Sequence, residues 1–289
     1  MSGHHEGHNE RVSLLERVLT HAVLLIMTAF ALYPILWVVS LALSPAGAPD
    51  ARVLPLPRTI SFDHFNELFG TDADARVLFA HQLTNSLVVA LVTSVSAIAL
   101  AAPASYALAR RQFVGKETGL SVLLATQMFP AALSLLPLYM ILEVFGLTDS
   151  RSGLVIVYAT TAVPFAIFQL KSAFEAVPRE IEEAARTDGA TDFQTFYLVA
   201  LPAVRPALAT TALFAFMLAW NEYVLAATLL TEESSYTLPI VLARYVGEHS
   251  ARWGTFAAGA IVVSVPVMAF FYLVQRHIVT GITAGSVKG

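Results

Sequence analysis

A polar stretch in the second half of the chain carries residues whose types and spacing could recognise another protein. Glu183 stands directly before Ala184 and Ala185, and Gly189 follows after three further residues. Two adjacent alanines keep a helix thin enough to enter a groove, and the neighbouring carboxylate can form a charged contact there. The chemistry expected here is therefore docking onto a partner. An ordinary amphipathic connector between two larger elements is the alternative interpretation.

Two short helices are needed to position these residues. Pro178 suits the first turn of the first helix, and the acids Glu180, Glu182 and Glu183 favour its positive N-terminus. This helix is expected to stop at Gly189, because glycine readily adopts the left-handed conformation that ends many helices.

The second short helix is expected to begin at Thr191. Gln194 lies three residues later and completes a capping-box pattern. Leu201 and Pro202 end this helix before a long apolar segment begins. Two short helices joined at a glycine corner would form a compact protrusion.

The sequence lacks the motifs that support enzymatic chemistry. It contains no GxxxxGK[ST] phosphate loop, no HExxH zinc pair, no GxSxG nucleophile elbow and no cysteine. His4, His5 and His8 are expected in a solvated tail, with metal contact as the alternative. We therefore expect no catalytic residue, no cofactor and no resident metal.

The composition indicates a membrane protein. Of the 289 residues, 56% are hydrophobic and 13% are charged, and that charged share is about half the share in soluble domains. A soluble enzyme or a disordered chain would need far more charge. The 17 basic and 21 acidic residues give a net charge of −4, which argues against nucleic-acid binding.

Six long stretches with almost no charge predict six transmembrane helices. A bilayer core needs about 20 helical residues, and each stretch reaches or approaches that length. The fifth stretch contains one acid, Glu222, whose insertion cost is outweighed by the Leu, Phe and Val residues around it. The expected fold is an all-α polytopic membrane protein with helices near 18–42, 83–109, 119–142, 153–170, 206–230 and 256–275.

The positions of lysine and arginine predict the orientation, because cytoplasmic loops are enriched in both. The N-terminal tail 1–17, the loop 171–205 and the C-terminal tail 276–289 are expected in the cytoplasm, around a membrane domain 18–275. The basic residues on this side are Arg11, Arg17, Arg110, Arg111, Lys116, Lys171, Arg179, Arg186, Arg205, Arg276 and Lys288. The other side holds fewer: Arg52, Arg58, Arg76, Arg151, Arg244 and Arg252.

Small side chains recur every four residues in the second and fifth expected spans, and small residues let helices approach closely in a membrane. Packing within the chain and contact with a second membrane subunit both fit this pattern. The two rows are Thr93, Ala97, Ala101, Ser105 and Ala109, and Ala207, Thr211, Ala215 and Ala219.

Prolines lie inside most of the expected spans and can kink them. Kinked helices often border transport pathways, although proline also occurs in ordinary spans. These residues are Pro34, Pro103, Pro130, Pro137, Pro164 and Pro266.

The loop of residues 43–82 contains Phe62, Phe65, Leu68 and Phe69. This spacing predicts a short helix with an aromatic face lying at the membrane surface. Docking of a partner on this loop is the alternative.

The loop residues together resemble a known motif. Glu183-Ala184-Ala185, Gly189, Val199 and Leu201-Pro202 resemble the EAA motif of ATP-binding-cassette (ABC) importer permeases, EAA-x3-G-x9-I-x-LP, with Val199 replacing isoleucine. Further stretches are similar to the carbohydrate branch, particularly maltose/maltodextrin permease subunits of the MalG type. These stretches are Asn85-Ser86, Tyr106 to Arg110, Trp220 to Tyr223, Tyr236 to Pro239 and Gly281 to Gly289.

The resemblance implies a type I (MetI-like) importer permease in the cytoplasmic, or inner, membrane of a bacterium or archaeon. It implies a sister permease that forms a heterodimer with this chain, an ATPase subunit dimer, an extracytoplasmic sugar-binding protein and a lipid bilayer as partners. ATP hydrolysis would belong to the ATPase, and the sugar would be maltose, maltodextrin, trehalose or a related oligosaccharide.

Two sets of contacts with the ATPase are implied by the resemblance. The coupling residues are Glu183, Ala184, Ala185, Asp188, Gly189, Leu201 and Pro202. The C-terminal residues Gly285, Ser286, Val287, Lys288 and Gly289 are similar to a tail that reaches the ATPase dimer.

Candidate residues of the translocation path lie in three places. Trp220, Asn221, Glu222 and Tyr223 combine aromatic and polar groups, which suits sugar stacking and hydrogen bonding. A structural acid paired across helices is the favoured alternative for Glu222. Asn85 and Gln127 are further candidates, although the resemblance implies that most sugar contacts lie in the sister permease.

An ion-coupled secondary transporter is the main competing class. Such proteins usually show paired intramembrane ionisable residues and internal repeats. Here Glu222 is the only charge within an expected span, and the EAA pattern is not repeated. An intramembrane enzyme would need a nucleophile–base pair or a metal-ligand set, and the sequence offers neither.

Overall fold

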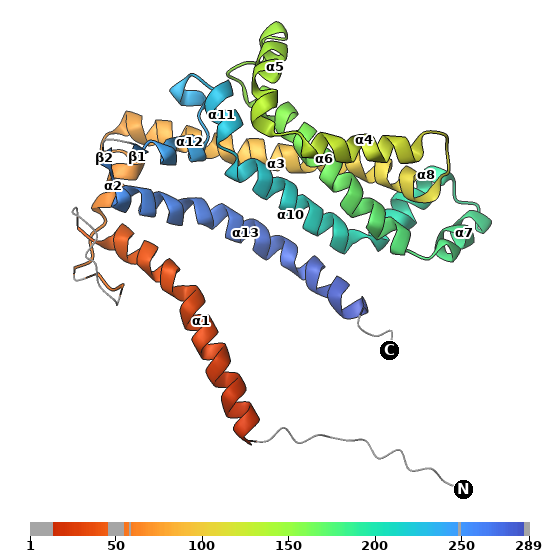
Figure 1. The fold of residues 1–289 in the computed structure, drawn as a ribbon, viewed down its shortest axis with the longest axis horizontal. Coiled ribbons are helices and arrows are strands. Elements are labelled where there is room, and N and C mark those ends of the chain that lie inside the picture. The colour runs from red at the N-terminus through yellow and green to blue at the C-terminus, as the bar shows by residue number, and fades with distance from the viewer. Residues whose placement is uncertain (1–13, 46–54, 58, 248–249, 286–289) are drawn as a thin grey trace.

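The computed structural model describes the chain except for residues 1–13, 46–54, 58, 248–249 and 286–289 (Figure 1). The described residues are almost entirely helical. In chain order the elements are α1 Leu14–Leu43, α2 Asp63–Phe69, α3 Ala73–Arg110, α4 Lys116–Met128, α5 Ala131–Val144, α6 Arg151–Ala176, α7 Arg179–Thr187, α8 Asp192–Gln194, the π-helical turn η1 Thr195–Ala200, α9 Leu201–Ala203, α10 Arg205–Asn221, α11 Val224–Leu229, the 3-10 turn η2 Glu233–Ser235, α12 Leu238–Ala243, the hairpin strands β1 Val246–Gly247 and β2 Ser250–Ala251, and α13 Trp253–Gly285.

Four described helices are long and apolar enough to cross a membrane: α1, α3, α6 and α13, the last as far as Arg276. Two bent pairs add to this number only if each pair forms one span. The first pair joins α4 to α5 through 103°, and the second joins 192–203 to α10 through 77°. The count is therefore four to six among the described residues, compatible with the six expected spans.

The long helix α3 lies at the centre of the body, against α6 and α10 (Figure 1). Its small residues Thr93, Ala97, Ala101 and Ser105 are fully buried. Ala97 meets Ala162 of α6 and Ala215 of α10 in one apolar cluster. The rows of small residues therefore pack within the chain, as the first of the two alternatives predicted, because methyl-sized side chains let three backbones approach closely.

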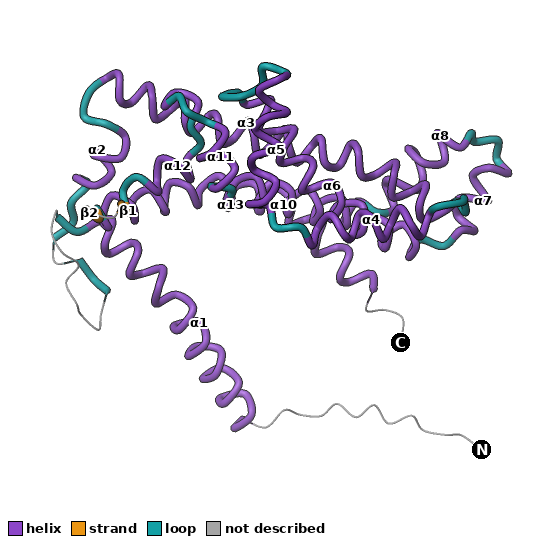
Figure 2. The backbone as a smooth tube through the Cα atoms, turned by 45° about the horizontal axis from the view of Figure 1, so that its top comes forward, coloured by secondary structure: helices purple, strands orange, loops and turns teal. Residues whose placement is uncertain are grey.

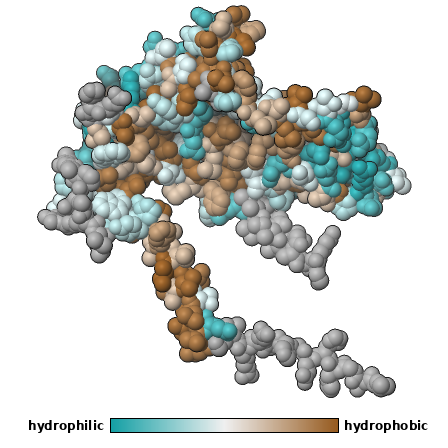
Figure 3. Space-filling model, in the orientation of Figure 1, coloured by the Kyte–Doolittle hydropathy of each residue, from teal (hydrophilic) through white to brown (hydrophobic). Residues whose placement is uncertain are grey.

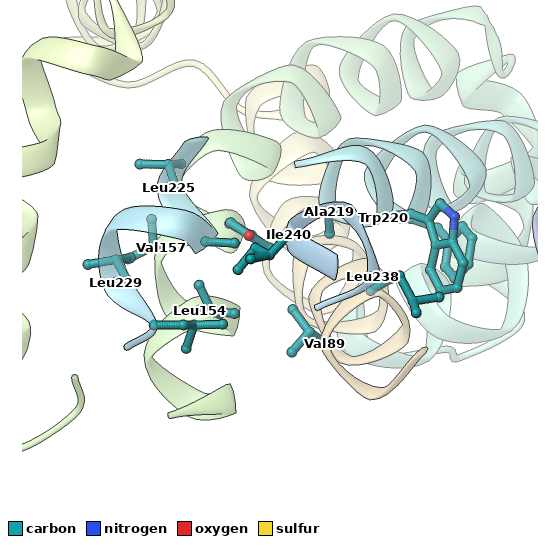
Figure 4. Close-up of a cluster of buried hydrophobic side chains, with 14 of the residues drawn as sticks. Val89, Leu154, Val157, Ala219, Trp220, Leu225, Leu229, Leu238 and Ile240 are labelled. Atoms are coloured by element: carbon teal, nitrogen blue, oxygen red, sulfur yellow. The ribbon is translucent and has the colours of Figure 1, made fainter. Parts of the chain in front are cut away.

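A larger apolar core joins most of the helices, and Figure 4 shows part of it. Leu225 and Leu229 of α11 face Leu154 and Val157 of α6. The other labelled residues are Val89 of α3, Ala219 and Trp220 of α10, and Leu238 and Ile240 of α12. The six-residue helix α11 is thus held by its buried apolar face.

Helix α1 stands away from the body in both ribbon views (Figures 1 and 2). Only its C-terminal part, with Ser40 and Ala42, is buried, where α1 approaches α13. The rest of α1 is apolar and exposed, whereas polar residues gather around α7 and α8 (Figure 3). An apolar helix without cover from its own chain requires lipid or another membrane subunit around it.

Two expected helices are interrupted in the structure. The expected helix 119–142 divides at Phe129 and Pro130, because the residue before a proline is pushed into an extended conformation. The expected helix 206–230 breaks at Glu222, which is extended and separates α10 from α11. Pro34, Pro103, Pro137, Pro164 and Pro266 lie inside continuous helices.

Helix α13 continues beyond its candidate span, which ends at Arg276, and reaches Gly285 within the expected tail 276–289. The short helix expected in the loop 43–82 is confirmed as α2. Its apolar face is largely used within the protein, since Leu68 is buried and Phe69 packs edge-on against Phe79, while Phe62 remains exposed.

Candidate functional site

The helix α7 forms the first half of the expected protrusion, and its end has a defined geometry. Gly189 has a φ of 92°, in the left-handed region. The Ala190 N–H donates to the Ala185 carbonyl and the Gly189 N–H to the Arg186 carbonyl, each at 3.0 Å. These two bonds are the Schellman arrangement and satisfy carbonyls that the helix end leaves free. The predicted glycine stop is confirmed.

The second half begins with the expected capping box. The Thr191 hydroxyl accepts from the Gln194 N–H, and the Gln194 side chain accepts from the Thr191 N–H. The next turn, η1, is π-helical and leads to Leu201 and Pro202 in α9. The Pro202 ring crowds the preceding turn, and a widened π-helical turn gives it more room. The 77° bend into α10 follows at once.

A buried ion pair attaches this protrusion to the end of α3. Glu182 is only 2% exposed, and Arg110 is 9% exposed at its side chain. The Arg110 Nε donates to Glu182 Oε1 at 2.8 Å, and the Tyr106 hydroxyl donates to Oε2 at 2.8 Å. Arg110 also donates to the Val177 carbonyl at 2.9 Å. Both carboxylate oxygens are thus hydrogen bonded, which burial of a charge requires.

The adjacent acid Glu183 is placed quite differently. Glu183, Ala184, Asp188 and Gly189 are exposed, and Ala185 is half-buried. Within the described residues, no ion pair joins the Glu183 carboxylate to a cation. Two consecutive carboxylates therefore differ in environment: Glu182 is buried and Glu183 is exposed.

Aromatic residues add an apolar surface to the protrusion. Phe193 and Tyr197 are exposed and stack in parallel with ring centroids 6.2 Å apart. Leu198 and Ile181 are also exposed. Exposed aromatic side chains next to a free carboxylate are typical of a protein-binding surface, where such rings act as anchors. Leu201 and Pro202 are half-buried behind this surface.

A second, exposed ion-pair group borders the first. Arg111 pairs with Asp192 at 2.6 Å, and Arg186 pairs with Asp192 at 3.4 Å. A polar pocket of about 370 Å³ lies between α3 and the protrusion. Its lining residues are Tyr106, Arg110, Arg111, Arg179, Glu182, Glu183, Arg186 and Asp192.

Asn85 and Trp220, two candidates for the translocation path, are inside the protein. Asn85 is fully buried and donates to the carbonyls of Ser234 and Tyr236 at 2.8 and 3.1 Å. Trp220 is buried and stacks on Phe216. The structure therefore gives both residues a packing role within the chain, and contact with the solute stays a prediction.

The carboxylate of Glu222 stabilises the helix break instead of lying free in a span. It accepts from the N–H groups of Leu225 and Ala226 and from the Tyr158 hydroxyl, each at 3.0 Å. These bonds agree with the favoured structural interpretation and explain the interruption, since a carboxylate bound to following N–H groups starts a new helix. Its neighbours Asn221 and Tyr223 are exposed.

Gln127 lies at a cavity, unlike the buried candidates. The cavity has a volume of about 1090 Å³ and lies between α3, α4, α5 and α6, beside the break at Pro130. Hydroxyl groups of Thr126, Ser134 and Thr160 share its mostly apolar lining.

Of the expected tail contacts, Gly285 ends α13, whereas 286–289 lie outside the described residues.

The opposite end of α3 carries a different set of bonds. Gln82 donates to the Glu233 carbonyl at 3.0 Å, and the Ser86 hydroxyl accepts from the Leu238 N–H at 2.7 Å. Together with the bonds of Asn85, they attach α3 to the segment 231–238. The α3 residues involved are neutral.

Two acids outside the long spans are stabilised in their ionised form. Burial raises the pKa of Asp149, but bonds from the Thr231 hydroxyl and the N–H groups of Glu232 and Thr231 outweigh it and leave this pKa below its usual range. Burial also raises the pKa of Glu67, and bonds from Thr255 and Arg252 outweigh it in the same way. Asp149 thereby attaches the start of α6 to 231–232.

Sequence analysis missed the role of Glu182, which it treated only as a helix-starting acid. A signal was present: Tyr106 and Arg110 are four residues apart, so they share one face at the end of α3. An arginine at a span end needs a partner when buried. Among the described residues no group of three or more His, Asp or Glu side chains could hold a metal ion.

This all-helical, apolar body with a polar two-helix protrusion has the architecture of a membrane permease. A chain of a bacterial ABC transporter that imports the acidic polysaccharide alginate superposes with a TM-score of 0.74 and 26% identity, over 94% of this chain and 99% of that chain. A chain of the inward-facing MetNI methionine ABC transporter gives a TM-score of 0.60 over 72% of this chain and 98% of that chain. At 15% identity the second likeness shows the fold alone.

Sequence relatives agree with the structural comparison. The trehalose transport system permease protein SugB of Mycobacterium tuberculosis is 38% identical over 91% of this chain and 95% of its own length. The maltose/maltodextrin transport system permease protein MalG of Escherichia coli is 35% identical over 94% of this chain and 95% of its own length.

Residues 97–283 match the family described as "Binding-protein-dependent transport system inner membrane component", and the chain belongs to this family. It is accordingly a non-catalytic, multi-pass permease subunit of an ABC importer in the inner membrane. ATP hydrolysis belongs to a separate ATPase subunit, and transport in this family depends on a binding protein.

Proposed function

We propose that this chain forms the translocation path of an oligosaccharide importer together with a sister permease. The transported solute is trehalose, maltose or a related oligosaccharide. The two transport-system permeases named above, each related over more than nine-tenths of this chain, support this substrate class. The exposed apolar length of α1 leaves a surface on which a sister subunit can pack beside lipid.

The protrusion couples this path to the ATPase. Its single strongest support is the contrast between Glu182, which is internally paired, and Glu183, which is exposed without a partner in the described residues. A docked basic side chain of the ATPase would form an ion pair with the Glu183 carboxylate. Ala184, Ala185 and Asp188 lie on the same helix, Gly189 turns the corner, and Leu201 and Pro202 connect the contact to α10.

The orientation follows from this role. Both termini and the protrusion lie in the cytoplasm, and the segment 231–238 and the hairpin lie outside, where the binding protein docks. The path runs along the face that holds the cavity near Gln127, with exposed Asn221 and Tyr223 at its outer part. Asn85, Trp220 and Glu222 support the helices around it.

The alternative of an ion-coupled secondary transporter has less support. Its one candidate ion carrier, Glu222, already accepts three hydrogen bonds from Tyr158, Leu225 and Ala226. A carboxylate so occupied suits a fixed helix break better than a site that loads and releases an ion in each cycle.

Composition of the native complex tests the proposal first. The chain is purified in mild detergent from native membranes, and co-purifying chains are identified by mass spectrometry. Recovery of an ATPase, a second permease and a sugar-binding protein is expected, and a panel of sugars in a melting assay of that binding protein then identifies the solute. Recovery of this chain alone, still transporting after reconstitution without ATPase, would overturn the proposal.

Charge reversal tests the docking contact itself. Glu183→Lys should abolish ATPase assembly and transport, because a like-charge contact would replace a pair. Glu180→Lys is the matched control, since Glu180 is exposed on the same helix and is not part of the motif. Deletion of 285–289 should weaken stimulation of the ATPase without affecting membrane insertion. Normal transport by Glu183→Lys contradicts the docking role, and unchanged stimulation after the deletion contradicts the tail contact.

A further inference from the structure

We propose that Tyr106, Arg110 and Glu182 are positioning residues that lock the coupling helix α7 to α3, so that α3 carries a displacement of α7 to the segment 231–238. This inference rests on the proposed coupling function and adds the route by which the coupling crosses the molecule.

At the α7 end, the carboxylate of Glu182 is charged, buried and hydrogen bonded through both oxygens. Glu182 is 2% exposed and uses both carboxylate oxygens, one for the Arg110 guanidinium and one for the Tyr106 hydroxyl. Arg110 also holds the Val177 carbonyl, at the junction where the chain leaves α6 for α7. Arg186 approaches the same carboxylate only to 3.9 Å, so Arg110 is its close cation, and separating a buried charge from its close partner has a large cost. The α7 helix and the end of α3 must therefore move together.

Helix α3 is built to carry that movement. Its 38 residues form one continuous helix, roughly 57 Å long at 1.5 Å per residue. Hydrogen bonds join α3 to neighbouring helices along this length. The Ser105 hydroxyl donates to the Ile167 carbonyl of α6 at 3.0 Å, and the Ser94 hydroxyl donates to the Ala212 carbonyl of α10 at 2.7 Å.

The far end of α3 is attached to a single segment. Gln82, Asn85 and Ser86 all bind the backbone of residues 233–238, and all three α3 side chains are buried. Asp149 fixes the same segment to the start of α6 through Thr231 and Glu232. A shift of α3 relative to α6 must therefore either move this segment or break buried bonds. The segment is thereby the part of the protein to which α3 would pass on such a shift.

The competing route is the covalent one, in which α7 pulls only on α6 and on η1. The two routes differ in what the Tyr106 hydroxyl and the Asn85 amide should do. In the covalent route both groups merely stabilise the fold. In the α3 route both affect how efficiently ATP hydrolysis is converted into transport, although they lie at opposite ends of a long helix.

The experiment uses the complete importer, with ATPase, sister permease and binding protein, in proteoliposomes. Sugar molecules transported per ATP hydrolysed are measured at saturating loaded binding protein. Glu182→Gln and Tyr106→Phe should each lower this ratio about fivefold or more, the size of an ordinary allosteric coupling. Asn85→Leu should act in the same direction. The double variant Tyr106→Phe/Asn85→Leu should be no worse than its worse single variant, because one broken link already uncouples the route.

Matched controls and a milder variant keep the test decisive. Arg111→Gln removes an exposed ion pair of the same protrusion and should leave the ratio within twofold of wild type. Tyr106→Phe removes one hydroxyl only, so it remains informative if Glu182→Gln does not assemble. Wild-type ratios for Tyr106→Phe and Asn85→Leu, or strictly additive losses in the double variant, would overturn the α3 route while leaving the importer function intact. A wild-type chain that neither binds an ATPase nor transports sugar would instead overturn the importer function and, with it, this route.

Discussion

The two ends of α3 are held by different chemistry. At the α7 end, the attachment centres on the buried carboxylate of Glu182, which pairs with Arg110, accepts from Tyr106 and has Arg186 at 3.9 Å. At the α12 end, the neutral side chains of Gln82, Asn85 and Ser86 bind backbone groups of 233–238. The first end concentrates its free energy in one pair, and the second distributes it over several modest bonds. A single substitution should therefore remove most of the attachment free energy at the α7 end but only part of it at the α12 end.

Loss of the Arg110 cation should have the largest effect. Arg110→Ala leaves the buried Glu182 carboxylate with Arg186 at 3.9 Å as its remaining cation, and the free energy of unfolding should fall by about 3–5 kcal/mol. Unfolding by SDS in mixed micelles measures the change. Arg111→Ala, at a pair whose side chains are about two-thirds exposed, should cost less than about 1 kcal/mol. Equal losses for the two variants would remove the contrast between concentrated and distributed attachment.

The second largest loss of stability is expected from crowding between α2 and α13. A Cβ at position 254 would lie 2.1 Å from His64 Nε2, so Gly254→Ala should push α2 from α13 and cost about 1–3 kcal/mol. The same micelle assay measures this cost, which should shrink in a His64→Ala background. Gly119→Ala is the control, because nothing lies within 4 Å of its added Cβ and alanine favours the helix. A loss that persists without the His64 ring would show that the crowding lies elsewhere.

The acid at this end should give a pH-dependent signature of moderate size. Asp149 has a φ of 55°, which asparagine tolerates, so Asp149→Asn removes the charge without adding strain. We expect a loss of about 1.5 kcal/mol at neutral pH. The folded-state pKa of Asp149 lies below its ordinary value of 3.8, so its contribution is full above that pH and is lost as the pH falls through the folded-state pKa.

Unfolding curves of wild type and Asp149→Asn from pH 7 downward measure this difference. The two curves should converge in acid. If the difference in free energy of unfolding instead grows as the pH falls, the ionised carboxylate of Asp149 does not stabilise the fold. Asp149→Ala should cost more than Asp149→Asn at every pH, because alanine is less tolerant of a positive φ.

The smallest effect is expected for the capping box of the protrusion. Thr191→Ala removes the acceptor for the Gln194 N–H and should cost about 1 kcal/mol. Hydrogen exchange of residues 191–194 should rise in this variant, while exchange around Arg110 stays unchanged. Ser121→Ala is a suitable control, since the Ser121 hydroxyl donates only to a carbonyl of its own helix. Faster exchange around Arg110 would mean that the ion pair depends on the cap.

Sequence reasoning succeeded where the signal is local. The glycine stop at Gly189, the capping box at Thr191 and the existence of α2 depend on residues within one or two turns, and all three are confirmed. The rows of small residues were recognised as packing surfaces by their spacing. Their partners could not be chosen from spacing alone, because a second subunit offers the same contacts as a second helix.

Other features depend on partners distant in the chain. Glu222 was expected in a continuous helix, but its carboxylate binds the start of α11 and also accepts from Tyr158, 64 residues away. Asn85 was a path candidate by residue type, yet its amide binds backbone about 150 residues away, at Ser234 and Tyr236. Glu182 and Glu183 look equivalent in the sequence, and nothing within the helix predicts which one turns inward.

The sequence by itself determined that the chain is an apolar, polytopic membrane protein with one polar, glycine-cornered protrusion, because hydropathy, capping and left-handed glycine are properties of neighbouring residues. Only the tertiary structure decided which of two adjacent acids is locked and which is free, where the spans break, and what joins the two ends of α3. Those outcomes depend on whether a buried charge or amide finds its partner from a distant helix, since burial without that partner costs more than the local preference of any residue.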